Sequence, residues 1–217
     1  MQETTRKKLQ NYFEKYPIIK YKKRQIILKP GDEVPFIGFT KSGYVRVYNI
    51  NENGQETTIQ ILKPIFSFTT IYAITGEKNK YFFEAISPVE LWTAPKDKTL
   101  EFMRADKELS DELTKLFLGY YLDLIDRLHL MLAGNASTKV MGVLTSLAEK
   151  FGEKSEKKTV TPLSVPHRLI ASMTGLTRET VTLQILKLQK QGLIENKGKR
   201  ISIKNVTTHD NNRELYQ

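Results

Sequence analysis

The stretch Val165–Gln191 reads VPHRLIASMTGLTRETVTLQILKLQKQ and predicts two short helices that meet at a tight turn. Pro166 suits the first turn of a helix, where its missing N–H group is not needed. Gly175 supplies the backbone freedom of a sharp turn, and Thr177 is a natural N-cap for the second helix. The apolar positions recur at helical spacing at Leu169, Ile170, Met173, Val181, Ile185 and Leu188. This pattern predicts a helix-turn-helix.

Arg178 and Glu179 are adjacent at the start of the second predicted helix, on its solvent side. An arginine can pair with O6 and N7 of guanine, and a glutamate can accept a hydrogen bond from N4 of cytosine. The alternative is that Glu179 only favours a helix N-terminus electrostatically, while Arg178 is simply solvated. That alternative leaves the rest of the motif unexplained, so we prefer the interpretation that the pair reads DNA.

Two strand-like runs follow the second helix and flank a turn at Lys197-Gly198-Lys199. A hairpin directly after a recognition helix extends the motif to a winged helix-turn-helix. Basic residues are concentrated in the same part of the chain. Residues 139–217 carry 14 Lys and Arg against 7 Asp and Glu, whereas residues 1–138 carry 20 against 17. A polyanionic partner is therefore expected for this region.

The absence of cysteine excludes disulfides, thiolate-bound zinc and cysteine-held iron–sulfur clusters. The three histidines, His129, His167 and His209, give weak support for haem, and we expect no cofactor and no metal. An enzyme of the metal-binding barrel class is improbable, because no histidine precedes His129 and no nucleophile set or phosphate-binding glycine loop replaces it. The sequence shows neither a secretion signal nor an 18-residue apolar run, so we expect a cytoplasmic protein without a membrane partner.

A helix over residues 5–16 is predicted at the amino terminus, followed by many short strands separated by turn residues. Tyr44–Tyr48 alternates as a strand does, and Asn51-Glu52-Asn53-Gly54 is a hairpin signal. This spacing predicts an all-β sandwich or barrel. The expected strands further along are residues 57–62, 66–71, 81–86 and 89–93.

Residues 108–132 form a long helical pattern without proline and with two apolar faces. The first face has the spacing of a coiled-coil seam, and we assign it to pairing between two copies of the chain. Its residues are Leu113, Phe117, Tyr120, Leu124 and Met131. The second face contains Leu118, Tyr121, Leu122, Ile125, Leu128 and Leu132. One face would pack on the β domain and the other on a partner chain, the alternative being a single buried core helix.

A further helix over residues 137–151 and a polar linker over residues 152–158 precede the helix-turn-helix. The fold class is therefore α+β. We expect residues 1–107 to form a β-roll, residues 108–136 a dimerisation helix with a hinge, and residues 137–217 the winged helix-turn-helix.

This order of parts resembles the Crp/Fnr family of bacterial transcription regulators over nearly the whole chain. Gly31, Gly43 and Gly54, with Asp32, look like the turn glycines of the cyclic-nucleotide-binding roll of that family. The run GLTRETV looks like the start of its recognition helix. The resemblance implies a homodimeric regulator that binds near-palindromic duplex DNA, with RNA polymerase as a further partner and a small molecule or peptide as effector.

Carried over by position, Arg178 and Glu179 match the base-reading Arg and Glu of the family. The third base-reading position is often Arg, but this chain has Leu183 there, followed by Gln184. Either Gln184 reads a base or it is a poorly satisfied packing residue. We include Gln184 and Thr182 among the base-reading candidates. The expected phosphate contacts are His167, Arg168, Thr177, Lys199 and Arg200.

The roll departs from the cyclic AMP pattern of the family. The stretch Phe66–Ile71 lacks the Glu that would take the ribose hydroxyl, and Lys78–Phe82 lacks the Arg that would pair with the phosphate. We therefore do not expect cyclic nucleotide binding. An apolar or peptide effector pocket is one reading of the aromatic residues Phe66, Phe68, Tyr72, Tyr81 and Phe83, and an ordinary core is the other.

We prefer a DNA-binding regulator, with or without an effector. The alternative is an architectural or partner-binding protein whose winged domain docks to another protein. The surplus of positive charge around residues 139–217 argues against that alternative, because protein partners do not generally require it.

Overall fold

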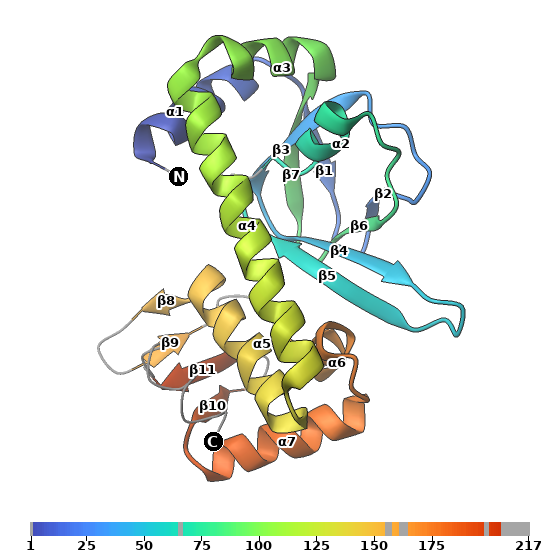
Figure 1. Cartoon of the computed structure of the whole chain (residues 1–217), viewed down its shortest axis with the longest axis vertical. Coiled ribbons are helices and arrows are strands. Elements are labelled where there is room, and N and C mark those ends of the chain that lie inside the picture. The colour runs from blue at the N-terminus through green and yellow to red at the C-terminus, as the bar shows by residue number, and fades with distance from the viewer. Residues whose placement is uncertain (1, 65–66, 155–157, 161–164, 198–199, 205–217) are drawn as a thin grey trace. The chain divides into compact units, whose positions relative to one another are not determined.

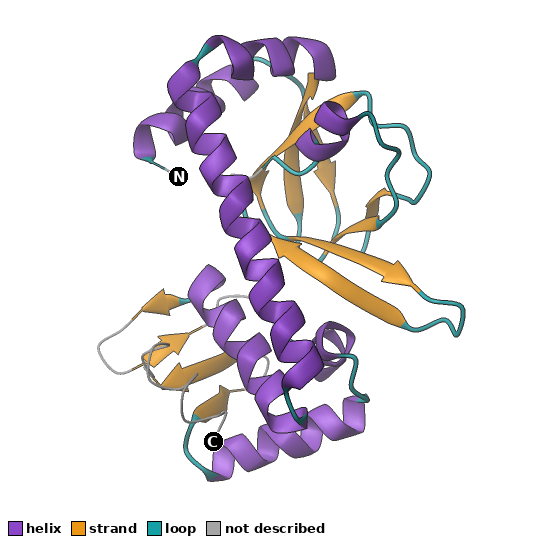
Figure 2. Ribbon diagram, in the orientation of Figure 1, coloured by secondary structure: helices purple, strands orange, loops and turns teal. Residues whose placement is uncertain are grey.

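The computed structural model describes residues 2–64, 67–154, 158–160, 165–197 and 200–204 and has two compact units, Met1–Leu122 and Asp123–Gln217. Both units combine helices with antiparallel sheets (Figures 1 and 2), so the expected α+β class is confirmed. The helices are α1 (Glu3–Phe13), α2 (Thr70–Thr75), α3 (Lys96–Ala105), α4 (Lys107–Ala133), α5 (Ala136–Phe151), α6 (His167–Thr174) and α7 (Arg178–Lys190). The strands are β1 (Ile18–Tyr21), β2 (Ile26–Leu28), β3 (Phe36–Ser42), β4 (Val45–Ile50), β5 (Glu56–Leu62), β6 (Phe82–Ala85), β7 (Val89–Pro95), β8 (Glu153–Lys154), β9 (Lys158–Val160), β10 (Ile194–Lys197) and β11 (Arg200–Lys204).

The first unit is a β-roll of two antiparallel sheets, with strand orders β1-β7-β3 and β2-β6-β4-β5. The predicted hairpin between β4 and β5 is confirmed: the N–H of Gly54 donates to the carbonyl of Asn51 at 2.9 Å. Gly43 turns the chain between β3 and β4 with a φ of +86°. A Cβ atom there would lie only 2.1 Å from the carbonyl oxygen of Pro88, so the turn requires glycine.

One hydrophobic cluster fills the space between the two sheets of the roll. Aromatic and branched side chains alternate inward along the strands, as expected for strands with one buried face. The buried members are Leu28, Val45, Val47, Leu62, Phe68, Phe83, Ala85, Val89 and Leu91.

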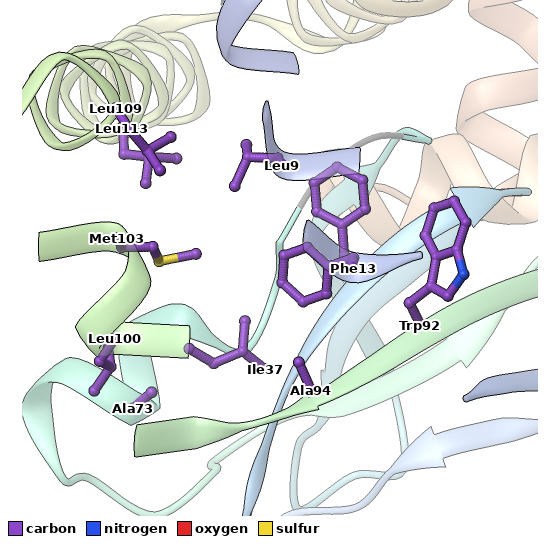
Figure 3. Packing of buried hydrophobic residues seen from close by; sticks show 11 residues of the cluster. Leu9, Phe13, Ile37, Ala73, Trp92, Ala94, Leu100, Met103, Leu109 and Leu113 are labelled. Atoms are coloured by element: carbon purple, nitrogen blue, oxygen red, sulfur yellow. The ribbon is translucent and has the colours of Figure 1, made fainter. Parts of the chain in front are cut away.

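A second cluster joins the other face of the β1-β7-β3 sheet to helices α1 to α4 (Figure 3). Phe13 of α1 stacks on Phe39 of β3 with ring centroids 4.8 Å apart, and Leu109 and Leu113 of α4 belong to the same cluster. At the rim, Lys8 donates to Asp106 at 2.8 Å and ties α1 to the junction between α3 and α4. The start of α4 is therefore an integral part of the roll.

The second unit packs α5, α6 and α7 with a four-stranded antiparallel sheet of order β10-β11-β9-β8. The end of α4 contacts α5 closely at Gly142, where a Cβ atom would lie 2.0 Å from a methyl carbon of Leu130. Asp123 of α4 and Lys150 of α5 form an ion pair at 2.8 Å. These contacts join the last turns of α4 to α5.

Two predictions of secondary structure were wrong. The strand expected over residues 66–71 is replaced by an isolated bridge at Ser67 and by α2, which begins at Thr70. The hydroxyl of Thr69 donates to the carbonyl of Phe36 and accepts from the N–H of Gly38, which stops the ladder before the helix. The polar linker predicted over residues 152–158 contains strand β8 and the first residue of β9, and these two strands pair antiparallel. Within the described ranges, no helix is both long and apolar enough to cross a membrane.

Candidate nucleic-acid interface

The turn between α6 and α7 has the geometry that the sequence predicts. Gly175 ends α6 in the left-handed conformation, with a φ of +70°, and its N–H donates to the carbonyl of Ala171 at 3.0 Å. Thr177 caps α7, because its Oγ1 accepts a hydrogen bond from the N–H of Thr180 at 3.1 Å. The helix-turn-helix is therefore built by an αL cap at Gly175, followed two residues later by an N-cap at Thr177.

The inward side of α7 consists of the apolar residues that the spacing predicts. Val181, Ile185 and Leu188 are buried. They recur one turn apart, so they form one continuous stripe facing the interior of the second unit. The apolar faces of α5 and α6 supply the remainder of this core at Val140, Val143, Leu144, Leu147, Leu169, Ile170 and Met173.

The outward side of α7 carries the residues proposed to read bases. Arg178 and Glu179 are exposed in the first turn of the helix. The carboxylate of Glu179 is also favourable for the N-terminus of the helix, whose unpaired N–H groups give it a partial positive charge. Lys187 and Lys190 are exposed further along α7. The outward side therefore presents one acidic and three basic side chains.

Thr182 and His167 form a bridge between the two helices. The Oγ1 atom of Thr182 donates to the carbonyl of Arg178 at 2.9 Å and lies 2.8 Å from Nδ1 of His167. Because the single hydroxyl hydrogen is used by Arg178, Nδ1 of His167 must carry the hydrogen that it shares with Thr182. We predict DNA contacts for both residues from the sequence. In the structure, their side chains form a hydrogen bond that joins the two helices.

Gln184 lies on the packing side of α7. Its side chain is half-buried, and its Oε1 is buried without a hydrogen-bond partner among the described residues. Of the two alternatives for this residue, the geometry therefore favours the poorly satisfied packing position. The burial of this oxygen argues against Gln184 as a base-reading residue.

The remaining phosphate candidates lie at the edges of the motif. Arg168 is exposed in the first turn of α6, and Thr177 is exposed while its Oγ1 serves the cap of α7. Arg200 begins β11 and pairs with Lys197 across the β10–β11 ladder. Lys199 lies outside the described residues.

Part of the α4 face that we assign to pairing between two chains packs instead on the roll. Leu113 is only 7% exposed within the core of the roll, and Phe117 and Tyr120 pack against the two clusters of the roll. Leu113 therefore has almost no surface left for a partner chain, which corrects its inclusion in the dimer seam. Leu124 is exposed and Met131 half-buried. The exposed apolar residues of α4 are Leu118, Tyr121, Leu122, Leu124, Ile125, Leu128 and Leu132.

The aromatic residues proposed for an effector pocket lie mostly in the core of the roll. Phe68 and Phe83 are buried, with ring centroids 5.3 Å apart, and Tyr72 and Tyr81 pack against the same cluster. A Cβ atom on Gly38 would lie 3.0 Å from the Phe68 ring, so the side chains fill this region closely. Burial raises the pKa of the Tyr72 hydroxyl above its usual value. Phe66 lies outside the described residues.

Known families match both units of the chain. Residues 18–106 match the cyclic nucleotide-binding domain, and residues 138–208 match the Crp-like helix-turn-helix domain. The two matches together cover most of the chain in the order expected for one family. The chain belongs to the Crp/Fnr family of transcription regulators.

Characterised relatives agree with this membership. A global nitrogen regulator of Synechococcus elongatus is 27% identical over 194 residues, which are 87% of this chain and 86% of the relative. The fumarate and nitrate reduction regulatory protein of Escherichia coli is 25% identical over 84% of this chain and 73% of its own length. Both relatives are named as regulators.

Solved structures share the Crp/Fnr fold. A cyclic nucleotide-binding domain containing protein of Listeria monocytogenes aligns with a TM-score of 0.78 at 17% identity, over 92% of this chain and 97% of that one. A Crp/Fnr family transcriptional regulator of Thermus thermophilus aligns with a TM-score of 0.69 at 24% identity, over 92% of this chain and 97% of that one.

Among the described residues, no group of three or more His, Asp or Glu is placed to hold a metal ion.

Proposed function

We propose that this Crp/Fnr protein acts as a homodimer that reads a near-palindromic operator with the N-terminal half of α7. The observation that carries the proposal is the exposed Arg178–Glu179 pair at the capped start of a helix whose opposite side is buried. Helix-turn-helix proteins place their second helix in the major groove, and the residues at its N-terminus contact the base edges. Arg178 would pair with guanine, and Glu179 would accept from cytosine.

The dimer in this proposal forms through the exposed apolar residues of α4. Seven large hydrophobic side chains on one helix are exposed in the single chain, and covering them gives the driving force for association. Two-fold symmetry then places the half-sites about one helical turn of DNA apart, roughly 34 Å. Such a dimer would act in the cytoplasm on duplex DNA, with RNA polymerase as the machinery that it influences.

The effector of this regulator, where one acts, is not a cyclic nucleotide in our proposal. Neither the Arg for the phosphate nor the Glu for the ribose is present in the corresponding stretches. The packing of Phe68, Phe83 and Gly38 also supports a filled roll interior, which favours the ordinary-core alternative over an apolar pocket. Titration of the full chain with cyclic AMP in a calorimeter should give no binding heat, and a saturable signal would contradict this part.

Selection from a random pool of duplex DNA tests the DNA-binding proposal directly. The full chain should enrich a two-fold symmetric sequence, and its affinity should fall steeply with salt because phosphate contacts release counterions. A monomer in light scattering, without enrichment of any sequence, would overturn the proposal. An architectural protein would instead bind selected and scrambled duplexes equally.

A further inference from the structure

Two large apolar side chains are exposed on the outward side of α7. Leu183 is 65% exposed and Leu186 is 51% exposed, whereas the apolar residues on the packing side of the same helix are buried. They are three residues apart, so they occupy neighbouring places on the helix surface. Leucine at this location is unusual, because the outward side of the helix otherwise carries charged residues.

Leu183 follows Glu179 by four residues and therefore lies on the same face, one turn further along α7. The neighbouring Thr182 uses its hydroxyl internally, on the carbonyl of Arg178 and on His167. In this turn of the helix, Leu183 is thus the side chain with free surface next to the proposed base-reading pair. Its contact with DNA must be apolar, because the side chain has no hydrogen-bonding group.

The charges around Leu183 define what can cover it. Arg178 lies before it, and Lys187 and Lys190 lie after it, all three exposed. A polyanion satisfies these three cations, whereas an apolar protein surface would bury them without compensation. The apolar group that duplex DNA offers in its major groove is the C5-methyl group of thymine.

We propose that Leu183 contacts a thymine methyl group in each half-site and so specifies thymine beside the base pairs read by Arg178 and Glu179. This inference rests on the proposed function of α7. Leu186 lies about 10 Å along the helix axis from Glu179, against about 6 Å for Leu183. Because base contacts come from the N-terminal part of a recognition helix, we assign the methyl contact to Leu183.

Replacing single thymines of the selected operator by deoxyuridine tests the proposal, because this change removes only the methyl group. When deoxyuridine replaces thymine at one symmetric pair of positions, we expect the affinity of the unaltered protein to fall. The expected loss is about fourfold per methyl group, which corresponds to burial of one methyl group. The variant Leu183→Ala should bind thymine and deoxyuridine operators equally well. The variant Leu186→Ala, the matched control on the same face, should still discriminate between them.

Arg178→Ala separates failure of this inference from failure of the proposed function. If Arg178→Ala loses operator preference while deoxyuridine has no effect at any position, the protein reads DNA but Leu183 does not read a methyl group. Equal deoxyuridine sensitivity in Leu183→Ala and the unaltered chain would overturn the inference as well. If Leu186→Ala alone stopped discriminating between thymine and deoxyuridine, the methyl contact would belong to Leu186 and not to Leu183. If neither Arg178→Ala nor Leu183→Ala alters operator binding, the proposed function itself fails.

Discussion

The Nδ1 atom of His167 on α6 lies 2.8 Å from the Oγ1 atom of Thr182 on α7, and this contact joins the two helices of the helix-turn-helix. Thr182 also donates to the carbonyl of Arg178 within its own helix. A single hydroxyl group therefore links the first residue of α6 to the first residue of α7. This link lies directly beside Arg178, one of the two residues proposed to read bases.

Thr182→Val removes the hydroxyl with almost no change in shape and leaves Nδ1 of His167 without its partner. We expect the free energy of unfolding to fall by about 0.5–1.5 kcal/mol, the net value of one hydrogen bond. Urea unfolding followed by circular dichroism measures this. Thr182→Ser keeps the hydroxyl and is the control, and equal stability of the Val and Ser variants would show that the bridge contributes nothing.

Gln184→Leu replaces a buried acceptor that lacks a partner among the described residues by an apolar side chain of similar size. We expect the free energy of unfolding to rise by about 1–2 kcal/mol, because the desolvation cost of the unpaired oxygen is removed. The selected operator should stay the same. A changed base preference with this variant would instead return Gln184 to the base-reading residues.

Arg178→Ala should cost about 1–3 kcal/mol of binding free energy and relax specificity at one base pair of each half-site. Competition assays with operators altered one position at a time would measure both effects. Lys190→Ala, which removes an exposed charge near the end of the same helix, is the control for charge alone. Equal losses on specific and scrambled duplexes for Arg178→Ala would show that it contacts only phosphate.

Leu128→Asp introduces a charge on the exposed apolar face of α4. We expect it to convert the proposed dimer to a monomer in light scattering, because burying an unpaired carboxylate in the interface is costly. Leu113→Ala, in the core of the roll, should leave the proposed dimer intact but lower the stability of the roll by about 2–5 kcal/mol. The reverse pattern would place the dimer seam on the Leu113 face.

The contact of Lys8 with Asp106 makes the stability of the roll depend on pH. The hydrogen bond from Lys8, followed by that from the backbone N–H of Leu109, lowers the pKa of Asp106 below its usual 3.8. A lowered folded-state pKa gives stability that is present above the unfolded pKa and is lost as pH falls through the folded one. The hydrogen bond to Asp106 also raises the pKa of Lys8 above 10.5, so its part is lost only in strong alkali.

Lys8→Met should therefore be less stable than the unaltered chain between about pH 5 and pH 10, with the difference shrinking as the pH falls below about 4. Thermal unfolding at pH 7 and pH 3.5 would check this. Lys7→Met is the control, because Nζ of Lys7 lies 3.8 Å from Oε1 of Glu3 and both side chains are exposed. An exposed ion pair of this kind contributes little to stability. A difference that stays constant with pH would contradict the assignment.

The helix-turn-helix could be predicted from sequence because its signals are local. A positive-φ glycine at 175, an N-cap at 177 and three buried positions of α7 are each determined by neighbours within a few residues. The roll could be predicted as a class for the same reason, since hairpin turns such as that at Gly54 are local too.

The faces of α4 could not be assigned from sequence, because both are apolar. The spacing of Leu113, Phe117 and Tyr120 satisfies a coiled-coil seam and a helix packed on a sheet equally well. Only the tertiary contacts of α4 with the roll decide between them. Likewise, the apolar run that begins at Phe66 looks like a strand, and the hydrogen bonds of Thr69 to residues more than thirty positions earlier determine where pairing stops.

The chain has a single tryptophan, Trp92, buried in the roll with Phe39 beside it and Lys41 over its ring. Its emission therefore comes entirely from the first unit, while the second unit is optically silent at tryptophan wavelengths. A change in that emission on adding an operator duplex would show that binding at the second unit alters the first unit. No dye would have to be attached to the protein.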